Sequence, residues 1–173
     1  KKDIELLSSQ VERCNEILKR LTLNPVEEDE FIDKDLTMRE YLSEIISSFK
    51  EISKKNFIFN FDQYSNIKKI TKSIEIVYGL RNFIGNANKF SKETIYITLK
   101  SNNEMTEIII EDDGNGYPRD VLSKIGEPYL RSKDPIEKSK TGLGLGLFIG
   151  KTLLEKNFAS INCRNSKTRS GAE

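Results

Sequence analysis

The chain has 173 residues, a length that suits one globular domain with an appendage. Of these residues 32% are charged and 36% hydrophobic, which is typical of a globular protein, and the net charge is +1. This balance argues against nucleic acid or an acidic membrane surface as the main partner, and no run of 18 apolar residues predicts a membrane span. Histidine is absent and the two cysteines, Cys14 and Cys163, form no CxxC pair, which excludes imidazole chemistry, a zinc site and a disulfide scaffold.

The first 22 residues carry a narrow apolar stripe. Its members are spaced three and four residues apart, and they are Ile4, Leu7, Val11, Cys14, Leu18 and Leu21. This spacing predicts a helix whose a/d seam must be covered by a partner helix. A helix from a dimeric bundle fits the pattern, and a helix packed on its own domain is the alternative. We assign residues 1–24 to this helix and residues 25–34, which contain Pro25 and an acidic run, to a linker.

Residues 35–173 have the pattern of one domain with mixed helices and strands. Thr37 and Glu40 are typical of a capping box, and they precede a helical stripe of Tyr41, Leu42, Ile45, Ile46, Phe49 and Ile52. Periodicity then predicts strands at 56–61, 94–100, 104–112 and 159–163, and helices at 73–90, 118–125 and 144–156. The polar stretch 126–141 has no core pattern and is predicted to be a mobile lid.

The order of these elements predicts the fold class. The polar turn at 101–103 joins two strands, most simply as an antiparallel hairpin. Helices and strands are mixed rather than strictly alternating. We therefore expect an α+β fold, a two-layer α/β sandwich in which helices cover one face of a mixed sheet. A doubly wound dinucleotide fold is disfavoured.

Polar residues at helical spacing mark the helix at 73–90. Asn82 and Asn86 are four residues apart and share one face, and Lys89 lies three residues further on nearly the same face. An amide oxygen suits Mg²⁺, and an ammonium group suits a phosphate. Two asparagines on a helix are usually ordinary surface residues, so their meaning depends on the glycine-rich segments that follow.

The first glycine-rich segment follows a predicted strand. Asp113 comes after the apolar run at 108–110, where its carboxylate can accept a hydrogen bond from the N6 amine of adenine. Gly114 and Gly116 let the chain turn tightly beside a purine. On its own, Asp113-Gly114 would indicate only a turn.

The second glycine-rich segment opens a predicted helix. Gly142, Gly144 and Gly146 lie at its start, where exposed backbone amides attract phosphate. A Rossmann motif is disfavoured because position 147 is leucine and a polar stretch, rather than a strand, precedes the glycines. In this order, the asparagine helix and the two glycine segments describe a nucleotide site.

These segments resemble the N, G1 and G2 boxes of the bacterial sensor histidine kinases, and Ile-Gly-Glu-Pro-Tyr-Leu-Arg at 125–131 resembles their F box. The resemblance runs from about residue 30 to the C-terminus. It implies the Bergerat-type ATP-binding fold shared by gyrase, Hsp90, histidine kinases and MutL, with ATP and Mg²⁺ as cofactors. It also implies that a last strand begins at 170–173 and is truncated, and that residues 1–24 are the second helix of a dimerisation and phosphotransfer domain whose phosphoacceptor helix is absent.

The resemblance also gives roles to single residues. Asn86 would ligate Mg²⁺, and Lys89 would contact phosphate. Arg131 would reach the γ-phosphate as the lid closes and would act in catalysis with Asn82. Phe90 stands where many kinases have tyrosine, so a hydroxyl contact is lost. The residues expected to bind the cofactor are Asn82, Asn86, Lys89, Phe90, Asp113, Gly114, Gly116, Tyr129, Arg131, Thr141, Gly142, Leu143, Gly144 and Leu145.

Asn82 distinguishes among members of the superfamily. Gyrase-type and Hsp90-type ATPases have a glutamate at this position as general base, and an amide is a poor base. We therefore expect a protein histidine kinase that donates the ATP γ-phosphate to a histidine outside these residues and thence to a response regulator. The alternatives are a superfamily ATPase that hydrolyses ATP and an anti-sigma-factor-type serine kinase. A degenerate, non-enzymatic scaffold is disfavoured because all four boxes are recognisable.

Two stretches, 10–18 and 125–129, resemble the redox-responsive kinases of the Reg/Prr type, which are membrane sensors with a redox-linked cysteine. Cys14 is then a candidate redox switch, and the alternative is a small apolar group in a helix core. The implied setting is the cytoplasmic domain of a bacterial inner-membrane sensor, attached to the membrane only through parts outside this sequence. The implied partners are a response regulator and a second copy of the full-length kinase, joined through the helix at 1–22, and no nucleic acid.

Overall fold

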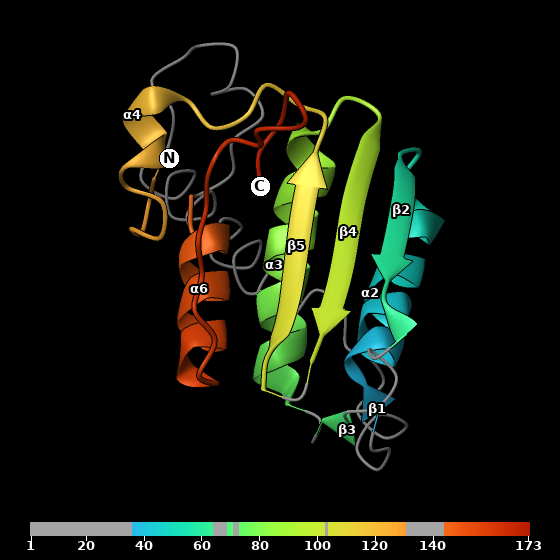
Figure 1. Cartoon of the computed structure of the whole chain (residues 1–173). Helices are drawn as coiled ribbons and strands as arrows, with labels where there is room; N and C mark the ends of the chain where they lie inside the picture. The colour runs from blue at the N-terminus through green and yellow to red at the C-terminus, as the bar shows by residue number, and fades with distance from the viewer. Residues whose placement is uncertain (1–35, 64–68, 71–72, 103, 131–143) are drawn as a thin grey trace, which may run out of the picture. The chain divides into compact units, whose positions relative to one another are not determined.

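The structure of the chain is a computed structural model, shown in Figure 1, and it describes residues 36–63, 69–70, 73–102, 104–130 and 144–173. The helix predicted at 1–24 and the linker predicted at 25–34 lie outside these described residues. Of the helices in the described ranges, none is both long enough and apolar enough to cross a lipid bilayer.

A three-stranded mixed sheet forms one layer of the domain. Its strands are β2 (Asn56–Phe61), β4 (Thr94–Ser101) and β5 (Thr106–Asp112), in the spatial order β2-β4-β5. Strand β2 runs parallel to β4, whereas β4 and β5 form the predicted antiparallel hairpin. A separate antiparallel pair, β1 (Leu36–Thr37) with β3 (Lys69–Ile70), is too short to leave a pattern in the sequence.

Helices form the second layer. They are α2 (Met38–Ile52), α3 (Ile74–Phe90) and α6 (Gly146–Lys156), together with the single turn α4 (Arg119–Leu122). In Figure 1, α2 and α3 lie behind the sheet, and α6 lies beside α3. Helices therefore cover one face of a mixed sheet, which confirms the predicted α+β two-layer sandwich.

The core lies between these layers. It consists of Leu42, Ile45, Ile46, Phe57, Leu80, Ile84, Ala87, Ile95, Ile97, Leu99 and Leu154. Helix α2 contributes most of the periodic stripe that its sequence predicts, but Ile52 at the end of that stripe is exposed. The predicted capping box is confirmed. The Thr37 hydroxyl accepts from the backbone N–H of Glu40, and the Glu40 carboxylate accepts from the backbone N–H of Thr37.

Two glycines bring α3 and α6 close together. A β-carbon at position 79 of α3 would lie 2.6 Å from Leu154 Cγ. A β-carbon at position 150 of α6 would lie 3.0 Å from the ring of Phe83. Larger residues at these positions would push the helices apart. The close approach places the glycine-rich start of α6 against the helix that carries the two asparagines.

The prediction of a strand at 159–163 is wrong, because that stretch forms no strand in the structure. A strand needs a hydrogen-bonded neighbour. Within the described residues, the outer edge of β5 is met instead by the end of the chain, since the Asp112 N–H donates to Ala172 O. Residues 164–173 fold back on themselves with a bridge between Asn165 and Ala172, and we call them the C-terminal hairpin.

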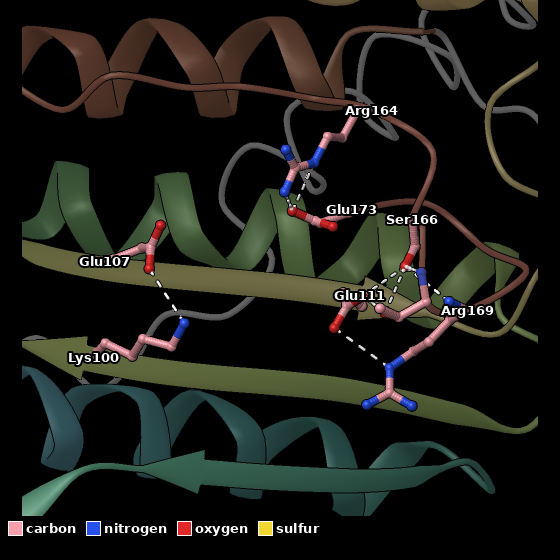
Figure 2. A network of polar contacts seen from close by, with 8 residues as sticks. Lys100, Glu107, Glu111, Arg164, Ser166, Arg169 and Glu173 are labelled. Carbon is pink, nitrogen blue, oxygen red and sulfur yellow. Dashed lines mark hydrogen bonds and ion pairs between the residues drawn. The ribbon is translucent and has the colours of Figure 1, made fainter.

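The C-terminal hairpin is attached to β5 by side chains, as Figure 2 shows. The Ser166 hydroxyl donates to Glu111 Oε1 at 2.7 Å, and Arg169 Nε lies 3.4 Å from Glu111 Oε2. The Arg169 guanidinium also lies 3.5 Å from the ring centroid of Tyr96 on β4. These contacts hold the C-terminal hairpin against the C-terminal end of β5 and the N-terminal end of β4.

Two helices are shorter than predicted, and the strand predicted at 104–112 begins at Thr106. The helix expected at 118–125 is limited to the four residues of α4, and the helix expected at 144–156 begins at Gly146. Gly126, after α4, and Gly144, before α6, have positive φ angles of 95° and 72°. This conformation is not helical, so neither helix includes these positions. Of the predicted lid at 126–141, residues 131–141 lie outside the described part of the chain.

Candidate functional site

Asp113 is engaged with the backbone at the start of β4. Its carboxylate accepts hydrogen bonds from the N–H groups of Lys92 at 2.7 Å, Glu93 at 3.1 Å and Thr94 at 3.0 Å. Burial pushes the pKa of Asp113 upward, but the hydrogen bonds from Glu93, Lys92 and Thr94 outweigh it, so the pKa lies below its usual value. This side chain fixes the connection between α3 and β4, and its role as an amine acceptor stays a prediction.

Asp112 is the buried carboxylate of the first glycine segment. It is 2% exposed, and its Oδ1 accepts from the N–H groups of Gly114 at 2.8 Å and Ala172 at 3.3 Å. Within the described part of the chain, its Oδ2 has no hydrogen-bond donor. Burial raises the pKa of Asp112 against these opposing bonds. Period-two alternation could have found it, since Ile108, Ile110 and Asp112 share the inward face of β5.

The two glycines of this segment are needed for different reasons. A β-carbon at position 114 would lie 2.4 Å from the carbonyl oxygen of Phe90, so only glycine lets the turn pack on the end of α3. Gly116 has a φ of 74°, a left-handed conformation that side chains disfavour. The turn therefore runs tightly from Asp112 across the C-terminal end of α3, as the sequence predicts for a tight turn.

Asn165 holds the far end of this turn, and sequence reasoning missed it. Its Oδ1 accepts from the Tyr117 N–H at 2.6 Å, and its Nδ2 donates to Tyr117 O at 3.1 Å. The two residues are 48 positions apart in the chain, so no local pattern links them. The contact comes from the C-terminal hairpin.

The predicted shared face of the asparagine helix is present on α3. Asn82 Nδ2 donates to the carbonyl of Tyr78 at 2.8 Å. Asn82 Oδ1 lies beside the start of α6, because a β-carbon at Gly146 would be 3.4 Å from it. Asn86 is partly buried, and its amide has no hydrogen-bond partner among the described residues. That amide therefore has both its oxygen and its N–H groups available to a ligand.

Lys89 and Phe90 end α3 next to the glycine turn. Lys89 is exposed, and its Nζ lies 5.6 Å from the ring centroid of Phe90. The Phe90 carbonyl touches the turn at Gly114, as described above. Three predicted positions at the other end of the site, Arg131 and the stretch 141–143 (Thr141, Gly142 and Leu143), lie outside the described residues.

The predicted F-box residues meet the second glycine segment at Gly144. The Leu130 N–H donates to Gly144 O at 3.2 Å, and a β-carbon at Gly144 would lie 2.3 Å from Leu130 O. Tyr129 has a φ of 60° and is 69% exposed, so its ring is accessible. Two segments that the sequence separates by a polar stretch are thus joined at the entrance to α6.

Among the described residues, the N-terminus of α6 has no side-chain cap and no acidic residue in its first turn. Its N-cap residue is Leu145. The first backbone N–H groups of a helix have no intrahelical acceptor. Together with the helix dipole, these groups favour an anion at this position.

These elements bring three kinds of chemistry next to α3. A buried carboxylate with a free oxygen, Asp112, suits a neutral amine donor. The uncapped start of α6 suits phosphate, and the amide of Asn86 suits a hard cation such as Mg²⁺. The described ranges contain no cluster of three or more acidic, cysteine or histidine side chains that could hold a metal by themselves.

Comparison with known proteins adds to this geometry. The family described as "Histidine kinase-, DNA gyrase B-, and HSP90-like ATPase" matches residues 71–172. Sensor histidine kinase RegB of Cereibacter sphaeroides is 31% identical over 95% of the chain, which spans 37% of that protein. Sensor protein RstB of Escherichia coli is 30% identical over 51% of the chain and 20% of that protein.

Solved structures share the fold. The catalytic domain of histidine kinase ThkA has a TM-score of 0.63 at 22% identity, over 76% of this chain and 88% of that chain. The mycobacterial sensor histidine kinase MprB has a TM-score of 0.60 at 20% identity, over 75% of this chain and 83% of that chain. At these identities the likeness concerns the fold, and the site must be argued from the residues themselves.

Proposed function

The chain belongs to the family of histidine kinase-, DNA gyrase B- and HSP90-like ATPases, and from this we propose that it is the ATP-binding catalytic domain of a two-component sensor histidine kinase. Domains of this family bind ATP. The chain contains no histidine, so the γ-phosphate would pass to a histidine outside these 173 residues. The observation that carries the proposal is that α3 is met at its C-terminal end by the glycine turn that follows buried Asp112, and at Asn82 by the start of α6, whose N-cap makes no side-chain bond.

We assign the purine amine to Asp112 rather than to Asp113. The Asp113 carboxylate already accepts from three backbone N–H groups. Asp112 keeps one oxygen without a donor in the described part of the chain, at the end of β5 and beside the glycine turn. A buried acceptor with one free oxygen discriminates an amine from a carbonyl at the same position of the base, because a carbonyl would face it with like charge.

The phosphates would lie between the end of α3 and the start of α6. Of the described residues, Lys89, Gly144 and Leu145 fit this role. We propose the same role for Arg131, Thr141, Gly142 and Leu143, which lie outside the described residues. Mg²⁺, when bound, would neutralise phosphate charge. Asn86 fits its coordination, since an amide oxygen without another partner can complete a shell that phosphates and water mostly fill. Asn82 would lie next to this site, beside the start of α6.

The asparagine at position 82 favours transfer of the γ-phosphate to a protein over hydrolysis of ATP. A hydrolytic enzyme needs a base for water, and an amide has no proton affinity for that purpose. Asn82 Nδ2 is already bound to the Tyr78 carbonyl, which orients its oxygen toward the start of α6. The ATPase remains the second candidate function, because the family description includes ATPases.

The partners and setting of the whole protein are part of the same proposal. The chain spans 37% of the length of the RegB protein that it resembles, so other segments would supply the sensor and the histidine. We expect a response regulator as phosphate acceptor, a homodimer through the helix at 1–22, and a position on the cytoplasmic side of the inner membrane. The candidate redox switch Cys14 and the lid residue Arg131 lie outside the described residues and stay proposals.

The test compares Asp112→Asn with Asp113→Asn by calorimetric titration of ATP and GTP with Mg²⁺. A hydrogen bond to a charged group contributes about 1.5–3 kcal/mol, so we expect Asp112→Asn to weaken ATP binding about 10- to 100-fold and to reduce the preference for ATP over GTP. Asp113→Asn should alter nucleotide affinity less, since its carboxylate binds backbone. Equal affinity of the wild-type chain for ATP and GTP would contradict the purine assignment, and a larger loss in Asp113→Asn would return the role to Asp113.

A further inference from the structure

We propose that Asn165 is a positioning residue for the purine, because its side-chain amide clamps the backbone of Tyr117 and so holds the glycine turn against Asp112. The inference rests on the proposed function, since it concerns the same nucleotide site. Asn165 itself lies on the C-terminal hairpin and not in any of the four sequence boxes. It acts through the turn and needs no contact with the ligand.

The clamp is bidentate. Asn165 Oδ1 accepts from the Tyr117 N–H and its Nδ2 donates to the Tyr117 carbonyl, so both polar groups of one peptide residue are matched by one amide. A serine side chain is shorter and offers one polar atom to the two groups of Tyr117, and alanine offers none. Cys163 adds a third contact, because its thiol is a hydrogen-bond partner of the Tyr117 phenol, and burial together with this neighbour raises the pKa of the phenol. Residues 163–165 therefore hold both the backbone and the ring of Tyr117.

The same hairpin also holds the near end of the turn. The Ala172 N–H donates to Asp112 Oδ1 at 3.3 Å, and the Asp112 N–H donates to Ala172 O at 3.1 Å. A β-carbon at Gly171 would lie 1.9 Å from Asp112 O, so the hairpin backbone lies directly against this residue. Asn165 and Ala172 are bridged to each other. The turn from 112 to 117 is thus fastened at its two ends by two facing positions of one hairpin.

A turn built on glycine needs such a support. Gly114 and Gly116 give the chain its tight path, but glycine also has the largest conformational freedom of any residue. A turn left free would have to be ordered when the nucleotide binds, and that ordering would reduce the affinity. The clamp orders it beforehand. Its loss should therefore weaken the recognition of the base more than that of the phosphates, which bind at the other end of the site.

The experiment compares Asn165→Ala, Asn165→Ser and the matched control Asn162→Ala by calorimetry with ATP, GTP and tripolyphosphate, all with Mg²⁺. Asn162 is exposed on the segment before the hairpin, and its side chain makes no hydrogen bond to the described residues. We expect Asn165→Ala to weaken ATP binding about 5- to 10-fold, the size of one or two neutral hydrogen bonds. The ATP-to-GTP preference should fall in parallel, tripolyphosphate binding should stay within about twofold, and Asn165→Ser should be intermediate.

The outcomes separate the positioning role from a merely structural one. Equal losses for ATP and tripolyphosphate, or ATP affinity in Asn165→Ala equal to that of Asn162→Ala, would overturn the inference. If Asn165→Ala does not fold, the ATP-to-GTP ratio of Asn165→Ser decides, and an unchanged ratio counts against the clamp. If the wild-type chain binds no ATP, the proposed function itself has failed. ATP binding by the wild type without an effect at position 165 refutes only the clamp.

Discussion

Asp112 and Asp113 are adjacent residues with opposite electrostatic surroundings. Asp112 is buried at the end of β5 and its pKa is raised by that burial. Asp113 lies at the surface of the connection between α3 and β4, where backbone N–H groups lower its pKa in spite of burial. An isolated Asp-Asp-Gly sequence cannot say which of its two carboxylates faces inward. The alternation of the preceding strand can, because every second residue of β5 faces the helices.

The pH dependence of stability should separate these two carboxylates. A lowered folded pKa means that Asp113 contributes stability above the ordinary aspartate value of 3.8, and that this contribution is lost as the pH falls through its folded pKa. A raised folded pKa means that ionised Asp112 costs stability, and that the cost disappears as the pH falls below 3.8. We expect Asp113→Asn to lose stability at neutral pH and to flatten the acid-induced loss, and Asp112→Asn to steepen it.

Urea unfolding between about pH 3 and pH 7 measures this dependence, with the slope given by the difference in bound protons between the unfolded and folded states. The wild-type chain and both single variants form the set. If Asp113→Asn unfolds with the same dependence on pH as the wild type, the three backbone hydrogen bonds do not stabilise the ionised form and the environment assigned to Asp113 is wrong.

At the scale of elements, α3 is the part on which the others are arranged. Its inward residues Leu80 and Ile84 pack in the core, and its asparagine face borders the site. Gly79 lets α6 approach α3, so the uncapped start of α6 lies next to Asn82. The site depends on the distance between two helices, and that distance depends on the absence of side chains at the crossing.

Two glycines of α3 offer a matched pair for testing this crossing. A β-carbon at Gly79 would lie 2.6 Å from Leu154 Cγ, whereas one at Gly85 would meet only the Phe49 ring, at an ordinary 3.5 Å. Overpacking typically costs about 1–3 kcal/mol, and alanine in a helix gains up to about 1 kcal/mol over glycine. We therefore expect Gly79→Ala to destabilise the chain and Gly85→Ala to leave its stability unchanged or higher.

Chemical denaturation of the two variants measures these free energies of unfolding. Both substitutions have the same helix propensity gain, so the difference between them isolates the contact with α6. Equal stabilities in the two variants would mean that Leu154 moves aside without cost, and that α3 and α6 do not require glycine where they cross.

At the scale of the whole molecule, the chain contains the proposed nucleotide site but not the histidine that would receive the phosphate. Its 173 residues include no histidine. In the proposed kinase, the acceptor would be held near the γ-phosphate by a tether within the same protein or dimer, and such proximity accounts for a large part of the rate.

We therefore expect no transfer of labelled γ-phosphate from ATP to the chain itself, and only weak transfer to a phosphotransfer domain supplied separately, because the tether is missing. Autoradiography of the two proteins after incubation with ATP and Mg²⁺ measures both, and the same mixture without the 173-residue chain is the control. Strong steady hydrolysis of ATP by the chain alone would favour the ATPase alternative over the kinase.

Sequence patterns by themselves determined most of the elements and the class of the fold. The capping box of α2, the helix α3, the β4–β5 hairpin and the shared face of Asn82 and Asn86 all depend on contacts between residues close in the chain. Such contacts leave a local signature, because helix and strand periods repeat within a few residues. The glycine segments were likewise recognisable from their composition, and with the asparagine helix they indicated a nucleotide site.

Only the tertiary structure decided the features that join distant segments. Asn165 meets Tyr117 across 48 positions, and Ala172 meets Asp112 across 60. The absence of a strand at 159–163 goes with the same fold-back of the chain end onto β5. A contact of this kind is made by an amide or a backbone group that many sequences could supply. Which residue becomes its partner depends on how the sheet and the helices pack. That packing leaves no repeating pattern in the sequence.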